Sequence, residues 1–182
     1  MTDSISRTSR LRLMLVLLVS LVGCDQASKQ YAVTHWAHLE KKVPAQSYVY
    51  DTFRITFAYN TGAFLGLLDK QSPTVRFLIL VVGNGGLLVA LAVTILMLPK
   101  IDRWSYLAWA LVFVGGIGNL IDRIRINAVI DFLNLGIGPL RTGIFNVADM
   151  AITLGFVMLV PQIFQREPKE TPAPVTTPGT PS

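Results

Sequence analysis

Residues 104–123 read WSYLAWALVFVGGIGNLIDR, an apolar stretch that ends in two opposite charges. About 20 apolar residues cross a bilayer as a helix, and aromatic residues such as Trp104 and Tyr106 are typical of its interface. The stretch therefore predicts a membrane-spanning helix over roughly Trp104–Ile121, followed by Asp122 and Arg123. Its end, GNLIDR, places an amide and a carboxylate three residues apart, on one face of a helix.

The composition of the whole chain agrees with a membrane protein. Of its 182 residues 52% are hydrophobic, and the mean hydropathy is +0.51. The formal net charge is +5, but the basic residues are scattered, so no nucleic-acid partner is expected. The single cysteine excludes an internal disulfide framework.

Three further stretches predict membrane spans. The first begins at Leu11 and reaches full length only if its helix continues through Asp25 and Lys29 towards Trp36. The second covers roughly Val75–Leu98 between two prolines, which are typical helix boundaries. The last covers roughly Phe145–Phe164.

The segments between and after the spans have a different texture. Residues 43–68 are rich in Tyr, Val, Phe and Thr, which predicts short strands, whereas residues 123–144 contain glycine and proline breakers and predict a loop. The tail, residues 167–182, is rich in proline and threonine and is predicted to be disordered. A single membrane domain is therefore expected within residues 11–166, after a cytoplasmic N-terminus of residues 1–10.

Basic residues near the span ends predict the orientation. Arg7, Arg10 and Arg12 favour a cytoplasmic N-terminus, and Lys100 and Arg103 lie in the short link between the second and third spans. An even number of spans returns the C-terminus to the cytoplasm and places both large loops outside. Those loops also contain arginines, so the charge rule favours this orientation without deciding it.

Four aspartates near the span edges are the candidate functional residues. Asp25, Asp122, Asp131 and Asp149 are costly there, since a charge near the bilayer centre costs about 2.5–3.5 kcal/mol. The spacing Asn-x-x-Asp occurs twice and predicts two amide–carboxylate pairs directed into one cleft. Two carboxylates close together share a proton, which is the acid–base arrangement of aspartic peptide hydrolysis.

Other chemistry has less support. His35 and His38 lack further metal ligands, and no histidine is placed to activate Cys24 as a nucleophile. Residues 21–24, LVGC, resemble a lipoprotein cleavage box, which would make the chain a substrate rather than an enzyme. Three further spans make it a poor lipoprotein cargo, so Cys24 is expected to pack near the end of the first helix. A small transporter or assembly factor with proton-relaying acids remains the alternative.

Five short blocks, in order along the chain, resemble lipoprotein signal peptidase, or signal peptidase II. They are Asp25-Gln26-Ala27-Ser28-Lys29, Asn60-Thr61-Gly62-Ala63-Phe64, Gly115–Arg123, Val129-Ile130-Asp131-Phe132 and Phe145-Asn146-Val147-Ala148-Asp149. The resemblance implies four transmembrane helices, a small extracytoplasmic β-platform over about residues 43–68, and no metal or other cofactor. It also implies a membrane-embedded aspartic endopeptidase that cuts diacylglyceryl-modified prolipoproteins just before the lipidated cysteine.

The resemblance also selects the catalytic pair. Asp122 adjoins Arg123, which favours an ionised carboxylate, whereas Asp131 has apolar neighbours in the chain. The family pattern pairs the aspartates of the last two blocks, so we expect Asp131 and Asp149 to be catalytic. The resemblance implies that four further residues bind substrate or support the site: Asn60, Asn119, Arg123 and Asn146. It implies that two acids are structural, Asp25 and Asp122.

The resemblance implies partners and a location as well. A monomer in the bacterial inner membrane is expected, in contact with membrane lipid and lipidated prolipoproteins, with its active site near the outer face. One departure concerns the NTGAF block, which has a single alanine where many relatives have two small residues before the aromatic. That difference bears on substrate preference or lid geometry and not on the catalytic pair.

Overall fold

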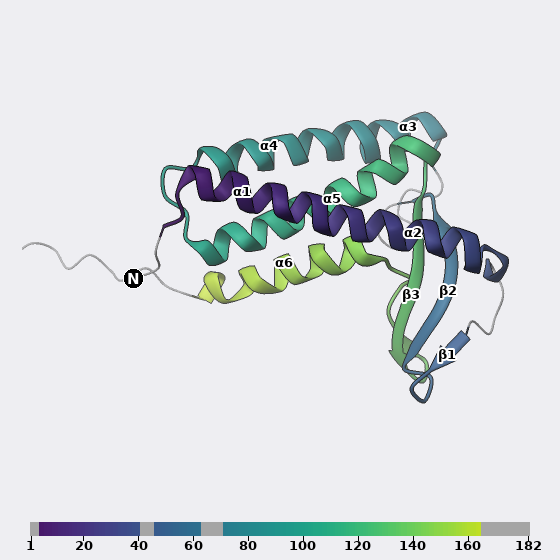
Figure 1. Ribbon diagram of the computed structural model, residues 1–182. Coiled ribbons are helices and arrows are strands. Elements are labelled where there is room, and N and C mark those ends of the chain that lie inside the picture. Colours follow the sequence, from purple (N-terminus) through teal and green to yellow (C-terminus); the bar gives the residue numbers. More distant parts are fainter. Residues whose placement is uncertain (1–3, 41–45, 63–70, 165–182) are drawn as a thin grey trace, which may run out of the picture.

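The computed structural model describes residues 4–40, 46–62 and 71–164. Helical rods run side by side, and a small sheet projects from one end of them across the helix direction (Figure 1). Part of the predicted β-platform, Ala63 and Phe64 of the NTGAF block, and the predicted disordered tail lie outside the described residues.

The first rod is one unbroken helical stretch with changes of helix type. It comprises α1 (Arg7–Leu17), the π-helical segment η1 (Leu18–Val22), α2 (Gly23–Trp36) and the 3₁₀ turn η2 (Ala37–Leu39). The helix therefore continues through Asp25 and Lys29, which the sequence required for a full span.

The second rod begins and ends where its prolines predict. It comprises α3 (Pro73–Phe77), the π-helical segment η4 (Leu78–Gly83) and α4 (Asn84–Met97). Ser72 caps it, because its side chain accepts a hydrogen bond from the Val75 amide at 3.3 Å. The helix ends two residues before Pro99, which cannot continue one.

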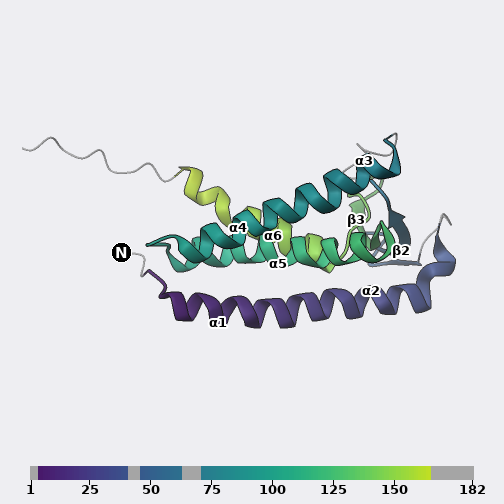
Figure 2. The ribbon, with the colours of Figure 1, turned by 90° about the horizontal axis from the view of Figure 1, so that it is seen from above.

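The third rod, α5 (Arg103–Ile126), is the central helix. Half of its most apolar window is buried, against 11% for each of the first two rods. Figure 2 shows it between α1–α2 on one side and α4 on the other. The helix runs past the predicted end at Ile121 and stops at Asn127, which adopts a left-handed backbone (φ 54°) as C-cap.

The fourth rod, α6 (Val147–Phe164), packs closely on α5. Glycines permit this approach: a Cβ on Gly115 would lie 2.5 Å from the Ala148 carbonyl oxygen, and one on Gly155 would lie 2.6 Å from that of Ala108. Small residues allow such close backbone contact between helices. Not every glycine in the helices has this role, since Gly86 has no neighbour within 4 Å of its Cβ position.

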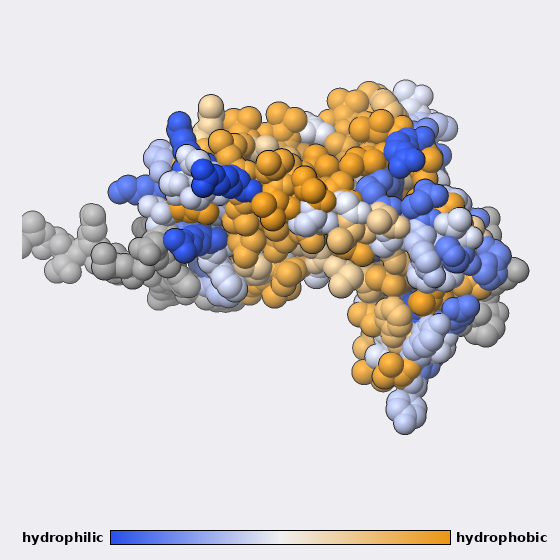
Figure 3. Space-filling model, viewed as in Figure 1, coloured by the Kyte–Doolittle hydropathy of each residue, from blue (hydrophilic) through white to orange (hydrophobic). Residues whose placement is uncertain are grey.

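Three of the rods are long and apolar enough to cross a membrane. They are residues Arg7–Leu39, Pro73–Met97 and Arg103–Ile126, while the apolar part of α6, Val147–Gln162, is shorter. Apolar surface covers the middle of the helical part, and polar residues gather towards its ends (Figure 3). These features agree with a helical membrane protein that has a small antiparallel sheet, but the described residues contain three helices of spanning length and not the predicted four.

The sheet corrects the predicted loop over residues 123–144. Its four strands are antiparallel in chain order: β1 (Gln46–Tyr48), β2 (Phe53–Asn60), β3 (Val129–Ile137) and β4 (Leu140–Arg141). Of the residues predicted to break structure, Gly138 (φ +55°) and Pro139 form the β3–β4 turn, whereas Gly136 lies inside β3 and pairs with Arg141. β3 is a strand because it pairs with β2, a partner distant in sequence that a local pattern does not reveal.

Candidate active site

Asp131 is held on β3 by two asparagine side chains. Its carboxylate is buried, with 2% of the residue exposed. Asn60, at the end of β2, donates to Oδ2 at 3.0 Å, and Asn146 donates to Oδ1 at 2.7 Å. The pairing of β2 with β3 and the start of α6 thus bring three separate blocks of the sequence to one carboxylate.

Asp149 lies in the first turn of α6, where it forms a reciprocal cap with Asn146. The Asp149 amide donates to Asn146 Oδ1 at 2.9 Å, and the Asn146 amide donates to Asp149 Oδ2 at 3.1 Å. This is the geometry of a capping box, in which residues three apart satisfy each other's free amides. The other oxygen, Oδ1, accepts from Asn119 Nδ2 of α5 at 2.7 Å.

A single asparagine connects the two carboxylates. Asn146 is fully buried, and its Nδ2 contacts Asp131 while its backbone amide contacts Asp149. Nδ2 also lies 3.1 Å from Asn119 Oδ1, so the two amides and the two carboxylates form one network. The repeated Asn-x-x-Asp spacing therefore has two uses: the second repeat caps α6, and the first contributes Asn119 to Asp149.

Burial raises the pKa of Asp131 from 3.8 to about 7. The removal of water from the charged form is the largest cause, and the negative charge of Asp149 adds to it. The hydrogen bonds from Asn60 and Asn146 and the positive charge of Lys29 act in the opposite direction. A carboxyl group with this pKa exchanges its proton near neutral pH.

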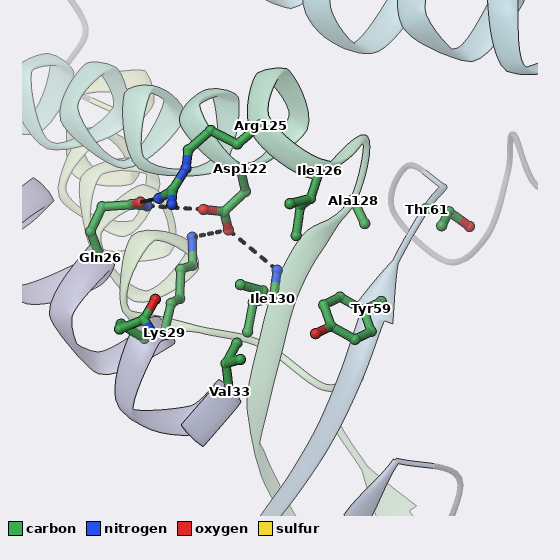
Figure 4. A pocket seen from close by; sticks show the side chains of 11 residues that line it. Gln26, Lys29, Val33, Tyr59, Thr61, Asp122, Arg125, Ile126, Ala128 and Ile130 are labelled. Atoms are coloured by element: carbon green, nitrogen blue, oxygen red, sulfur yellow. Dashed lines mark hydrogen bonds and ion pairs between the residues drawn. The ribbon is translucent and has the colours of Figure 1, made fainter. Parts of the chain in front are cut away.

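A second buried cluster is centred on Lys29 and is joined to the Asp131–Asp149 network through Asn119. The Nζ of Lys29 is 2.8 Å from Asp25 Oδ2, 2.9 Å from Asp122 Oδ2 and 3.0 Å from Asn119 Oδ1, so three acceptors receive its three hydrogens. Figure 4 shows Lys29 reaching from α2 towards Asp122 on α5. Asp25, Lys29 and Asp122 are each at most 3% exposed.

The two acids of this cluster also contact the elements that carry the candidate pair. Asp25 Oδ1 accepts from the Ala148 amide, at the start of α6, at 2.8 Å. Asp122 Oδ2 accepts from the Ile130 amide, next to Asp131, at 3.3 Å. The cluster thus connects α2, α5, β3 and α6 directly behind the carboxylates.

Sequence reasoning missed part of this cluster. Lys29 was not among the predicted site residues, although it binds Asp25, Asp122 and Asn119. Gln26 was not predicted at all, yet its Nε2 lies 3.0 Å from Asp122 Oδ1. The four-residue spacing of Asp25 and Lys29 inside an apolar helix was the available signal.

Arg123 is placed apart from this cluster, beside a cleft of about 440 Å³. The cleft runs between the end of α5 and the second rod, and Thr61 and Asn127 also line it. The charge of Arg123 acts on both Asp131 and Asp149. Its buried Nε has no hydrogen-bond partner among the described residues.

A second cleft, of about 460 Å³, is lined by Lys29 and Asp122. Figure 4 shows it between α2, the end of α5 and the strands β2 and β3. Its polar lining includes Gln26, Arg125 and Tyr59. Neither cleft is lined by the carboxylates of the candidate pair themselves.

Cys24 and His35, which the sequence offered for other chemistry, do not belong to either buried cluster. Cys24 is exposed on the side of a continuous helix, which corrects the expectation that it packs near the end of a span. His35 lies exposed on α2 with its Nδ1 3.0 Å from the Tyr31 carbonyl oxygen. Within the described residues, no group of three or more His, Cys, Asp and Glu side chains is arranged to hold a metal ion.

Comparison with known proteins identifies the family. The sequence profile described as "Signal peptidase (SPase) II" matches residues 17–165. The chain belongs to the signal peptidase II family. The lipoprotein signal peptidases of Streptococcus pyogenes serotypes M2 and M6 are each 35% identical to this signal peptidase over 157 residues, which is 86% of this chain and 95% of theirs.

Solved structures share the fold of this signal peptidase. A bacterial membrane enzyme determined by the in meso method at 2.3 Å resolution has a TM-score of 0.70 at 23% identity, covering 93% of this chain and 99% of that one. Another, at 1.9 Å resolution, has a TM-score of 0.71 at 24% identity, with coverage of 92% and 99%. The helical rods and the projecting sheet are therefore a known membrane-enzyme architecture.

Proposed function

We propose that this signal peptidase is an aspartic endopeptidase that cuts signal peptides from diacylglyceryl-modified prolipoproteins, just before the lipidated cysteine. Asp131 and Asp149 are its catalytic pair. The main support is that Asn146 contacts both carboxylates while the pKa of Asp131 is raised to about 7. The names of the relatives favour this function over a transporter or an assembly factor.

The proposed chemistry uses one proton on the pair. The protonated aspartic acid donates a hydrogen bond to the scissile carbonyl oxygen, while the ionised partner removes a proton from the attacking water. The resulting tetrahedral intermediate collapses when the leaving amine receives a proton from the pair. The pair thus regains its starting state of one proton, and no metal takes part in any step.

The surrounding amides have positioning roles in this proposal. Asn60 and Asn146 orient Asp131, and Asn119 orients Asp149, through the hydrogen bonds described above. Arg123 lines the cleft, its Nε has no partner among the described residues, and it is suited to bind a backbone carbonyl of the substrate. Asp25 and Asp122 are structural, because Lys29 and backbone amides occupy their oxygens.

We propose the following arrangement in the membrane. α6 is the fourth span, both termini are cytoplasmic, and the enzyme is a monomer of the bacterial inner membrane. The pair lies near the end of the helices that carries the sheet, opposite the end with Arg7 and Arg103 (Figure 1). The positive-inside rule then favours a position of the pair near the outer face.

Complementation tests the function as a whole. In a strain depleted of its own enzyme, expression of this chain should remove the accumulated lipidated precursor. Purified protein in detergent should likewise cut a lipidated prolipoprotein. It should not cut the same precursor when that precursor carries no lipid. Equal cleavage of both precursors would contradict the proposed substrate, and cleavage of neither would contradict the peptidase.

The raised pKa of Asp131 predicts the pH dependence of both activity and stability. Activity should fall as pH rises through about 7, because the pair then loses its shared proton. Folding raises this pKa, so the native state binds the proton more tightly than the unfolded state does. Stability should therefore decline between the unperturbed value of 3.8 and about 7 as pH rises.

Thermal unfolding in detergent at a series of pH values measures this effect. Asp131→Asn, which has no proton to lose, should show a flatter profile over that interval. If the unfolding temperatures of the two proteins changed in parallel with pH, the assignment of the raised pKa to Asp131 would be contradicted.

A further inference from the structure

The sheet has two faces of opposite character, and its strand register defines them. Directly paired residues of antiparallel strands place their side chains on the same face, and residues two apart on a strand do so as well. Tyr48 pairs with Phe53, Phe53 with Leu135, and Ile137 with Leu140. In the outer part of the sheet one face therefore carries Gln46, Tyr48, Phe53, Ile55, Leu133, Leu135, Ile137 and Leu140, which are mostly apolar. Further in along β3, the same face carries Asp131.

The opposite face is polar in this outer part of the sheet. Its side chains are those of Ser47, Arg54, Asn134 and Arg141. Arg54 forms a two-bond ion pair with Asp51, with distances of 2.7 Å and 2.6 Å, and Arg141 Nε donates to Asn134 Oδ1 at 2.6 Å. The sheet is thus as amphipathic as a surface helix, with one face suited to water.

The outer part of the apolar face has no protein cover within the described residues. Ile137 is 79% exposed and Leu140 is 82% exposed, while Tyr48 and Leu135 are exposed to a lesser degree. Only the inner part is covered, since Leu133 packs against the core cluster that contains Phe57 and Phe132. An apolar surface of this kind usually marks an interaction site.

The two hairpin tips are also fixed relative to each other. Arg141 Nη1, from the β3–β4 hairpin, donates to the Asp51 carbonyl oxygen at 2.8 Å, and the Gly136 amide donates to that of Thr52 at 2.9 Å. The exposed apolar residues of both hairpins therefore belong to one preformed surface rather than to two independent loops.

The direction of this surface identifies what covers it. The sheet projects across the helix direction, from the end of the apolar rods (Figures 1 and 2). Figure 3 shows hydrophobic atoms on the side of the sheet that faces back along the helices, and polar atoms on the outward side. The apolar side of the sheet adjoins the apolar surface of the helices and extends across the helix direction. It would therefore lie along the surface of the bilayer.

We propose that the apolar face of the sheet rests on the lipid surface, with Ile137 and Leu140 inserted among the acyl chains near the headgroups. Tyr48 then lies at the interface, which tyrosine favours. The polar face, with Arg54 and Arg141, remains in water. This seating sets the depth of β3, and hence of Asp131, relative to the membrane, and it holds whether or not the chain is a peptidase.

Depth measurements in a bilayer test the proposal. In a Cys24→Ser background, Leu140→Cys carries a spin label on the apolar face, and Ser47→Cys carries one on the polar face as matched control. Both positions are exposed, so both variants should fold. In lipid nanodiscs, the ratio of oxygen to water-soluble nickel accessibility should be at least about threefold higher at residue 140, as expected for shallow burial.

Other outcomes identify other occupants and overturn the proposal. Equal ratios at the two positions would mean that the face lies in water. Dipolar broadening between labels at residue 140 would mean that a second copy of the chain covers it. Immobilisation of this label only after addition of a prolipoprotein would mean that the face binds substrate.

Discussion

Asp131→Asn is expected to abolish cleavage of a lipidated prolipoprotein, and Asp149→Asn is expected to do the same. The amide of asparagine is not acidic enough to act as the general acid towards a carbonyl oxygen. It is also too weak a base to remove a proton from water. Loss of one general acid or base lowers the rate by about 10²–10⁴-fold. The measurement is single-turnover cleavage in detergent, with thermal unfolding to verify that each variant is folded.

Asp102→Asn is the matched control. Asp102 caps α5, accepting from the Ser105 amide at 2.9 Å, and asparagine caps a helix as well as aspartate does. The same chemical change at that position should leave cleavage unaltered. The double variant Asp131→Asn/Asp149→Asn should be no slower than either single one, because residues that act as a unit are not additive. Activity retained in either folded single variant would refute the aspartic mechanism.

Lys29→Met is expected to cause the largest loss of stability. Lys29 is 1% exposed and forms ion pairs with the carboxylates of Asp25 and Asp122, which are also buried. Removing one partner from a buried ion pair leaves an uncompensated charge and costs about 3–5 kcal/mol. Thermal unfolding in detergent should show this as a large fall in the midpoint, whereas Lys100→Met, which removes an exposed cation, should have little effect.

A triple variant separates charge from packing. Asp25→Asn/Lys29→Met/Asp122→Asn removes all three charges and should recover a large part of the lost stability, since a neutral buried cluster carries no unpaired charge. A triple variant as unstable as Lys29→Met would show that the lysine acts through its packing or its hydrogen bond to Asn119 instead.

Local patterns were sufficient for the helices. Pro73 begins the second rod and Asp102 caps the third, and both follow rules that involve only a few neighbouring residues. The predicted loop over residues 123–144 was wrong because β3 is a strand only through its partner β2. Strand pairing depends on residues distant in sequence, and the breakers Gly136 and Gly138 concealed it.

Arg10 shows a similar limit. The sequence predicts its side of the membrane from its charge, but the side chain is 1% exposed and donates to the Leu98 carbonyl oxygen at 2.6 Å and to that of Ile5 at 3.0 Å. The arginine thus binds the end of α4, whose last carbonyls lack partners within the helix. Positive charge at a helix C-terminus is favourable, but no sequence pattern indicates which helix will receive it.

Apolar length and charge placement are local properties, so the amino-acid sequence alone was enough to identify an apolar helical protein with acids at the edges of its spans. The blocks that carry the family resemblance are likewise local. Which side chains meet depends on the packing of the whole chain. Asn146 reaches Asp131 and Asp149, Lys29 joins Asp25 to Asp122, and the register divides the sheet into two faces, because each contact joins residues from separate elements whose packing no local pattern specifies.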